Sequence, residues 1–569
     1  MDFKQKAEEK KMSMSKNIAR LAVTAGLTAA LSFGGVMAPV TMAFAEGEAN
    51  GSVTITNANG NETNFKGYKI FDANVVKDEN GQTLVSNITW ANNKVETAVT
   101  EEIEKIDSNA SITTAQDAAD WIKTHVRGTD ETTSVESGSA AYKIAAAVAA
   151  VTGLDDSSDY ATTSKGAASN LSHGYWLFVT DAATVEGVEA ATAPIFTVVG
   201  DEAININEKT SIPTVDKEVK EGDNWRKVSD SYIGEEVEYK LTGHVASNIA
   251  TFNKYEYVFQ DTLSKGLEVV KDSNDAAKDL HVYIDNKGKQ TEVVQDANNG
   301  YKVALGQDKA TKKENLTITF SDLKAVKDKT GAPIKVDANS SVVVTYKAKL
   351  NSDVEYGATG TTNEVKLVYS NNPMSNGTGT SVSTKVTDHV FRLDVTKVDK
   401  DDQTHKLEAT FQVKMTHEGN KKLTQEKWLT QEGGLTEEGT NAGKFKTDKD
   451  SGEIYIPGLV AGTYEITECN TPAGYNTLAP FTITVAPTYN DDGSLKSLGV
   501  TSSDTEMVTP RTTNDATIPV TIQNKKGSGL PLTGLNGVTF TWIAGGAVLC
   551  IGVAHLIRSR KQAEESEQE

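Results

Sequence analysis

Cysteine is nearly absent from this chain of 569 residues, which contains only Cys469 and Cys550. Cys550 lies in a long apolar run near the C-terminus, so the two thiols are poorly placed to pair with each other. Disulfides are the usual covalent reinforcement of proteins that work outside the cell. If the chain is secreted, some covalent bond other than a disulfide has to reinforce it.

Positive charge is also scarce, because 57 Lys and Arg residues stand against 78 Asp and Glu residues and give a net charge of -21. Such a chain repels phosphate groups, which argues against a nucleic-acid partner. The sequence has no Walker loop, HExxH, G-x-S-x-G or CxxC motif, and its eight histidines show no metal-ligand spacing. We therefore expect no metal site, no cofactor and no enzymatic activity. A surface hydrolase would need a clustered nucleophile and base, which the sequence does not offer.

Proline is rare as well, with 12 residues, and hydrophobic residues make up 38% of the chain. This composition favours folded domains over disorder, and the length suggests three or four of them. Residues 1–45 have the pattern of a secretory signal: basic residues, an apolar stretch and then Ala43-Phe44-Ala45 before a cleavage point at Glu46. Acidic residues near Met1 are unusual there, so Met12 or Met14 is an alternative start.

Residues 527–569 end the chain with a pentapeptide, an apolar run over 538–557 and a basic cluster over 558–561. The run has about the 20 apolar residues that a membrane helix needs, and the basic tail favours the cytoplasmic side. This order resembles a sortase sorting signal. The resemblance implies that a sortase cleaves between Thr and Gly of the pentapeptide Leu530, Pro531, Leu532, Thr533 and Gly534. A permanent membrane anchor is the alternative.

Residues 46–210 contain strand-like runs at 52–56, 67–71 and 174–179, with helix-like Ala-rich stretches at 115–126 and 140–151. The two aromatic runs resemble those of the N-terminal domain of Gram-positive shaft pilins. Residues 211–389 show short strands spaced by turns, such as 237–241 and 342–346, which indicates a β-sandwich.

Residues 390–526 carry a second such pattern, with glycine-led strands at 452–459 and 462–468 and the turn Pro472-Ala473-Gly474-Tyr475. This pattern resembles the Cna-B type of immunoglobulin-like domain. The predicted fold class is therefore all-β: tandem immunoglobulin-like β-sandwich domains, the N-terminal one with some helix.

Domains of these two types often hold an internal Lys–Asn isopeptide bond, so the resemblance implies two clusters. The chemistry needs a neutral Lys amine, an Asn side chain that loses ammonia and a protonated acid. Burial favours both unusual protonation states, because it lowers a Lys pKa and raises an Asp or Glu pKa. The predicted clusters are Lys397, Asn524 and Glu468 in the last domain, and Lys217, Asn363 and Asp261 in the middle one. Lys220 replaces Lys217 if the strand register slips, and ordinary surface charge is the alternative for all six.

A second linkage is expected between copies, because a sortase holding the chain at Thr533 needs an amine acceptor. Lys209 is the candidate, since it lies in the boundary segment just before the strand that carries Lys217. Many shaft pilins have a Y-P-K triplet at this boundary and this sequence does not, so a plain linker lysine is the alternative.

The resemblances together predict a secreted structural protein, the shaft pilin of a sortase-assembled pilus on a Gram-positive cell. Its expected partners are pilus-class and housekeeping sortases, other copies of itself and peptidoglycan, with a host-surface ligand as a further candidate. The alternative is a monomeric wall-anchored adhesin or a minor pilin at the base or tip.

Overall fold

The computed structural model describes residues 51–56, 63–77, 83–126, 135–155, 157–185, 190–208 and 210–527. The predicted signal peptide, the candidate acceptor Lys209, the sorting pentapeptide and the apolar run at 538–557 lie outside these residues. Within the described ranges, no helix combines the length and apolar character needed to cross a bilayer.

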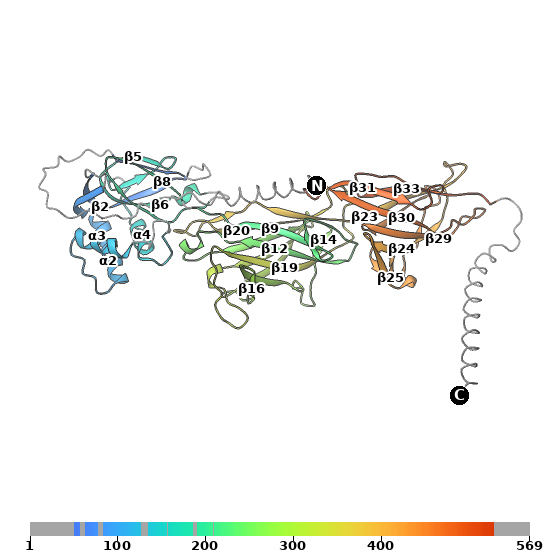
Figure 1. The fold of residues 1–569 in the computed structure, drawn as a ribbon, viewed down its shortest axis with the longest axis horizontal. Coiled ribbons are helices and arrows are strands. Elements are labelled where there is room, and N and C mark those ends of the chain that lie inside the picture. The colour runs from blue at the N-terminus through green and yellow to red at the C-terminus, as the bar shows by residue number, and fades with distance from the viewer. Residues whose placement is uncertain are drawn as a thin grey trace, which may run out of the picture.

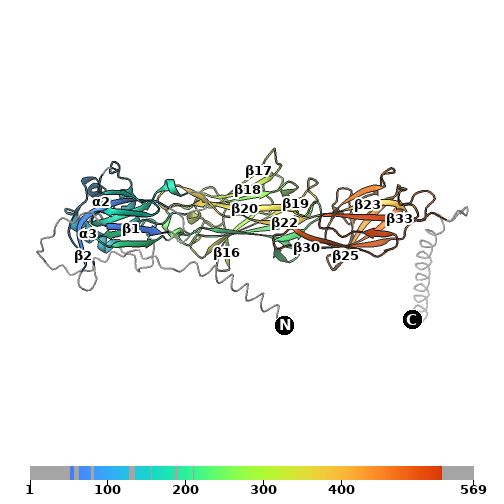
Figure 2. The same ribbon diagram turned by 90° about the horizontal axis from the view of Figure 1, so that it is seen from above.

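The described strands form three successive groups that follow one another along a single long axis (Figures 1 and 2). Separate hydrophobic cores lie within residues 53–206, 219–390 and 391–522. Strands dominate throughout, and the α-helices of the described residues all belong to the first group. The prediction of an all-β chain with some helix at its N-terminal end is therefore confirmed.

The first group has a sheet in the order β5-β1-β8 and a larger one in the order β3-β2-β6-β7, with β4 paired to β2. Its strands are β1 (Gly51–Thr56), β2 (Phe65–Lys77), β3 (Thr83–Trp90), β4 (Tyr160–Thr162), β5 (Ala167–Leu171), β6 (Gly174–Thr180), β7 (Ile195–Val199) and β8 (Ala203–Asn207). Its helices are α2 (Asn93–Ile106), α3 (Ala115–His125) and α4 (Ala140–Ala149), which gather on one side of the strands (Figure 1).

Two of these helices, α3 and α4, lie where the Ala-rich stretches predicted them, whereas α2 was not predicted. Its sequence mixes Val, Thr, Glu and Lys, and it buries one narrow stripe of Val95, Val99 and Ile103. Asn92 begins the helix, because its side chain accepts a hydrogen bond from the Val95 amide. The helix is stabilised by packing its apolar stripe on the first core rather than by strong intrinsic propensity.

The middle group is a sandwich of two sheets, in the orders β10-β9-β12-β19-β15-β16 and β11-β22-β20-β13-β18-β17, with β14 paired to β19 and β21 to β20. The first sheet holds β9 (Thr214–Glu221), β10 (Asn224–Arg226), β12 (Glu236–His244), β14 (Leu267–Val269), β15 (His281–Asn286), β16 (Lys289–Glu292) and β19 (Ser340–Leu350). The second holds β11 (Val228–Asp230), β13 (Tyr257–Leu263), β17 (Lys302–Gln307), β18 (Glu314–Phe320), β20 (Thr361–Ser370), β21 (Thr378–Thr380) and β22 (Thr384–His389). Alternating burial along β12, β19 and β20 places every second side chain in the shared core.

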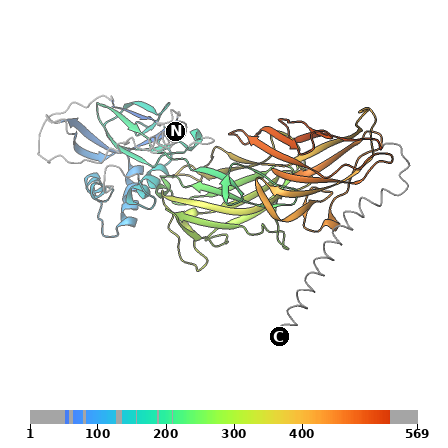
Figure 3. The ribbon, with the colours of Figure 1, turned by 45° about the vertical axis from the view of Figure 1, so that its right-hand side comes forward.

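The last group is a smaller sandwich of a sheet in the order β28-β23-β33-β32 and one in the order β26-β25-β24-β29-β30-β31, with β27 paired to β24. Its strands are β23 (Phe391–Asp399), β24 (Thr410–Glu418), β25 (Lys421–Leu429), β26 (Leu435–Thr436), β27 (Phe445–Lys446), β28 (Glu453–Leu459), β29 (Gly462–Asn470), β30 (Phe481–Tyr489), β31 (Leu495–Ser502), β32 (Val508–Pro510) and β33 (Thr517–Asn524). Figure 3 shows this sandwich continuing the axis of the middle one.

The first and last strands of a group run side by side and parallel in two of the three groups. In the first group β1 pairs with β8, and in the last group β23 pairs with β33 over its whole length. In the middle group the parallel partner of the final strand β22 is the short β11.

Hydrogen bonds also join neighbouring groups. Between the first and middle groups, the Ala191 amide donates to the Asn371 carbonyl at 2.6 Å, and the Tyr142 hydroxyl donates to the Pro373 carbonyl at 2.7 Å. Between the middle and last groups, the Ala461 amide donates to the Asp230 carboxylate. The groups are therefore in direct contact along the axis.

Candidate functional site: two buried clusters of lysine, acid and asparagine

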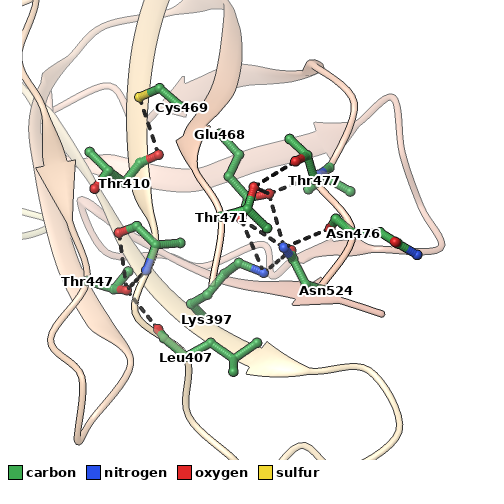
Figure 4. Close-up of polar contacts among 12 residues, drawn as sticks. Lys397, Leu407, Thr410, Thr447, Glu468, Cys469, Thr471, Asn476, Thr477 and Asn524 are labelled. Carbon is green, nitrogen blue, oxygen red and sulfur yellow. Dashed lines mark hydrogen bonds and ion pairs between the residues drawn. The ribbon is translucent and has the colours of Figure 1, made fainter. Parts of the chain in front are cut away.

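In the last sandwich, Lys397, Asn524 and Glu468 lie together in the core, as their predicted roles require (Figure 4). The Lys397 amine donates to Asn524 Oδ1, and it lies 3.8 Å from Glu468 Oε1. Asn524 Nδ2 donates to both Glu468 oxygens at 3.0 Å. The side chains of Lys397 and Glu468 are both 0% exposed, and Asn524 is buried as well. The amine, the amide and the acid are therefore inaccessible to solvent.

Strand pairing explains how these three residues meet. In the parallel pair of β23 and β33, Lys397 lies opposite Ile522 and Asn524 lies opposite Asp399. Along the paired strands, Lys397 therefore lies two residue positions before Asn524. Its long side chain extends in the strand direction to the Asn524 amide. Glu468 comes from β29 in the facing sheet, so the cluster bridges both layers of the sandwich.

The segment after β29 covers the cluster and orients the acid. Glu468 Oε2 accepts hydrogen bonds from the Leu478 amide at 2.8 Å and from the Thr471 hydroxyl at 3.1 Å. The carbonyl of Asn476 accepts a further bond from Asn524 Nδ2 at 3.1 Å (Figure 4). The sequence pattern around Pro472 therefore has a physical role, because its turn brings these groups over the buried amide.

Burial changes the protonation of the lysine. Desolvation lowers the pKa of Lys397 to about 8, although the Glu468 carboxylate opposes this shift. At pH 7 an amine with this pKa is neutral in about one molecule in ten, against a few in ten thousand for an ordinary lysine. The cluster therefore supplies a nucleophilic amine, a carbonyl carbon beside it and an acid in contact with both.

The middle sandwich brings Lys217, Asp261 and Asn363 into a second buried cluster, and each is exposed by 1% or less. Lys217 lies in β9 of one sheet, whereas Asp261 and Asn363 lie on the adjacent strands β13 and β20 of the other. The Lys217 amine donates to Asp261 Oδ1 at 2.5 Å. Desolvation lowers the pKa of Lys217 to about 8, against the opposing effect of Asp261.

The register alternative at Lys220 does not fit this geometry. In β9 the inward positions include Lys217 and Val219, whereas Lys220 points outward. Lys220 donates to Glu238 at 2.8 Å on the surface. Lys217 is therefore the lysine that lies with Asp261.

Sequence reasoning missed Tyr346 of β19, which occupies the centre of the middle cluster. Its hydroxyl lies 3.1 Å from Lys217 Nζ, donates to Asp261 Oδ2 at 2.6 Å and accepts from Asn363 Nδ2 at 2.7 Å. The alternating run at 342–346 did predict a strand. What it could not indicate is that the Tyr346 hydroxyl would face a lysine rather than merely filling the core.

The acidic runs at 399–402 and 491–492 form polar turns. Asp399 Oδ1 accepts from the amides of Asp401 and Asp402, and Asp492 accepts from Ser494, so both acidic loops are hydrogen-bonded turns. No group of three or more metal-ligating side chains occurs within the described ranges. Cys469, at the end of β29, is an exposed free thiol whose Sγ contacts the Thr410 carbonyl (Figure 4).

Comparison with family models finds a match for one part of the chain. Residues 391–497 match the family described as SpaA, prealbumin-like fold domain. The matched residues lie within the last sandwich. No curated protein matches the chain.

Solved structures with a similar arrangement include three backbone pilins. The T6 backbone pilin of Streptococcus pyogenes serotype M6 is 16% identical, with 85% of this chain and 100% of that chain covered and a TM-score of 0.44. The major pilin SpaA of Corynebacterium diphtheriae is 13% identical, with coverages of 84% and 100% and a TM-score of 0.42. The pilus 2b backbone protein of group B streptococcus is 22% identical, with coverages of 55% and 99% and a TM-score of 0.38. Sequence identities and TM-scores this low assign no role to any residue of this chain.

Proposed function

We propose that this chain is the shaft subunit of a covalent pilus on a Gram-positive cell surface, with domains at 46–210, 211–389 and 390–526. The observation that carries the proposal is the pair of buried clusters, Lys397–Glu468–Asn524 and Lys217–Asp261–Asn363. Burying a lysine amine is unfavourable unless it is paired or serves a reaction. Two such sites in one nearly cysteine-free chain support bonds that replace disulfides.

In each cluster the neutral lysine attacks the Asn carbonyl carbon, and ammonia leaves. The product is an isopeptide bond between strands, formed once and without an enzyme. Each bond lowers the mass of the chain by about 17 Da, the mass of ammonia. Intact-mass measurement of residues 46–533 should therefore fall about 34 Da below the sequence mass. A mass equal to the sequence mass would refute both internal bonds.

Assembly joins the C-terminal segment of one copy to an internal lysine of the next. A sortase cleaves between Thr533 and Gly534 and transfers the Thr533 carbonyl to an amine of the next copy, for which Lys209 is the candidate. A housekeeping sortase attaches the finished fibre to peptidoglycan. The match of residues 391–497 to the SpaA prealbumin-like fold domain supports a pilin role.

A denaturing gel of cell-wall extract tests this assembly. A shaft subunit should give a ladder that survives boiling in detergent, and Lys209→Ala should abolish it. Lys220→Ala is the matched control, because Lys220 is a nearby surface lysine that pairs with Glu238, and it should leave the ladder intact. If the ladder persists in Lys209→Ala, the acceptor is another lysine. A single band in the unmodified protein would instead indicate a monomeric wall-anchored adhesin.

A further inference from the structure

The two clusters differ in how the acid reaches the asparagine. In the last sandwich, both Glu468 oxygens contact Asn524 Nδ2 directly at 3.0 Å. In the middle sandwich, the hydrogen bonds that join Asp261 to Asn363 among the described residues pass through the Tyr346 hydroxyl. Aspartate is one methylene shorter than glutamate, and the phenol occupies the position between the acid and the amide.

We propose that Tyr346 is a catalytic residue of the middle cluster, relaying a proton between Asp261 and the leaving nitrogen of Asn363. This inference rests on the proposed internal bonds and adds a fourth group to one of them. The Tyr346 hydroxyl contacts both reacting side chains, at 3.1 Å from Lys217 Nζ and 2.7 Å from Asn363 Nδ2. A hydroxyl can donate and accept at once, which the relay requires.

The hydrogen bonds of Tyr346 to Lys217, Asp261 and Asn363 provide a route for each proton transfer. Lys217 begins as an ammonium and gives one proton to the Tyr346 hydroxyl, which passes its own proton to Asp261 Oδ2. The neutral amine then attacks Cγ of Asn363. The Nζ–Cγ bond forms, and Asp261 Oδ2 passes a proton to Tyr346 while Tyr346 gives its hydroxyl proton to Nδ2. The Cγ–Nδ2 bond breaks and ammonia leaves. The second proton released by Nζ departs with the ammonia as ammonium.

The surroundings hold the phenol in place for this role. Tyr346 is 0% exposed, and its ring stacks on Tyr239 with centroids 5.5 Å apart and planes 17° apart. Both rings also lie near the Lys217 amine, with centroids 5.5 and 5.7 Å away. The side chain of Asn363 is buried, and no hydrogen-bond partner is found for its Oδ1 among the described residues. The Tyr346 hydroxyl is therefore the contact that orients this amide.

Removing the hydroxyl tests the relay. In residues 46–533, which contain every described element, Tyr346→Phe should slow the middle bond by roughly 100-fold or more, the scale of a lost proton-transfer group. Freshly purified variant protein should lack about 17 Da, one ammonia, instead of about 34 Da. Peptide mapping should find the Lys397–Asn524 cross-link at its normal level and the Lys217–Asn363 cross-link depleted.

Two further variants make the result specific. Tyr239→Phe is the matched control, because Tyr239 stacks on Tyr346 but directs its hydroxyl to Asp388 at 3.4 Å, and the middle cross-link should form normally. If Tyr346→Phe does not fold, fluorotyrosine at position 346 keeps the hydroxyl and makes it more acidic. A changed rate of middle-bond formation then supports the relay, and an unchanged rate overturns it.

The outcomes separate this inference from the function on which it rests. Full cross-linking of Tyr346→Phe at the wild-type rate overturns the role of Tyr346 and leaves the proposed bonds standing. If the wild-type chain has no Lys217–Asn363 cross-link, the proposed bond does not form and the role of Tyr346 is refuted with it.

Discussion

The Lys397–Asn524 cluster leads to a mechanical prediction whose size follows from the structure. The two residues are 127 positions apart in sequence. With the bond in place, tension on the chain ends crosses from Lys397 to Asn524, and the segment between them carries no force. Lys397→Met keeps the apolar bulk of the side chain and removes the amine, so unfolding under tension should release that segment. At about 3.4 Å per residue, 127 residues give roughly 430 Å of extra extension.

Single-molecule pulling on residues 46–533 measures this extension directly. Unmodified protein should show no unfolding step of that length, whereas Lys397→Met should show one in each molecule. Lys400→Met is the matched control, because Lys400 follows three residues later and pairs with Glu506 near the surface, and it should behave like the unmodified protein. A roughly 430 Å step in the unmodified protein, or its absence in Lys397→Met, would refute the cross-link.

The same substitution has an equilibrium counterpart. A closed loop of 127 residues restricts the unfolded chain by about 5 kcal/mol in the loop-entropy estimate. Chemical denaturation of Lys397→Met, followed by hydrogen exchange in peptides from residues 391–524, should show this loss. Peptides from the first sandwich serve as the internal reference, and an equal loss there would point to general destabilisation instead.

The remaining predictions concern the acid, the sandwich junction and a tight turn. Glu468→Gln should leave the last cluster unbonded, with no Lys397–Asn524 peptide and a mass about 16 Da higher than the unmodified protein, because the retained ammonia adds about 17 Da and the substitution removes about 1 Da. Burial raises the pKa of Asp388 to about 7, so the folded state keeps a proton that the unfolded chain releases, and stability should fall as pH rises from about 4 to about 7. Melting curves at several pH values should show this fall, and Asp388→Asn should reduce it. Gly458→Ala should lower the melting temperature more than Gly474→Ala, because both glycines have positive φ but only at Gly458 would a Cβ meet a backbone oxygen, at 1.8 Å.

The strand architecture was predictable because apolar alternation and turn spacing depend on local sequence. The runs at 237–241 and 342–346 became β12 and β19, and the aromatic runs became β2 and β6. Helix α2 was not predicted, because its three buried residues are separated by Thr, Glu and Ala, and packing on the first core stabilises the helix.

The clusters were predictable only in part. Family resemblance supplied the lysines, acids and asparagines, and strand alternation separates Lys217 from Lys220 once the inward face of β9 is known. The sequence could not indicate Tyr346, because its proposed role depends on which residues of the facing sheet lie near its hydroxyl. Asp261 and Asn363 both lie within 3 Å of it. That information is set by the pairing of two sheets, and no run of adjacent residues contains it.

The parallel pairing of first and last strands has a consequence for how such modules are joined. In the pair of β23 and β33 the chain enters at Phe391 and leaves at Asn524, which lie at opposite poles of the strands, about 26 Å apart for eight residue steps. An antiparallel pair would have returned the chain to the pole where it entered. Each module with this pairing therefore extends a series instead of folding it back, and inserting another copy would lengthen the molecule without redirecting either end.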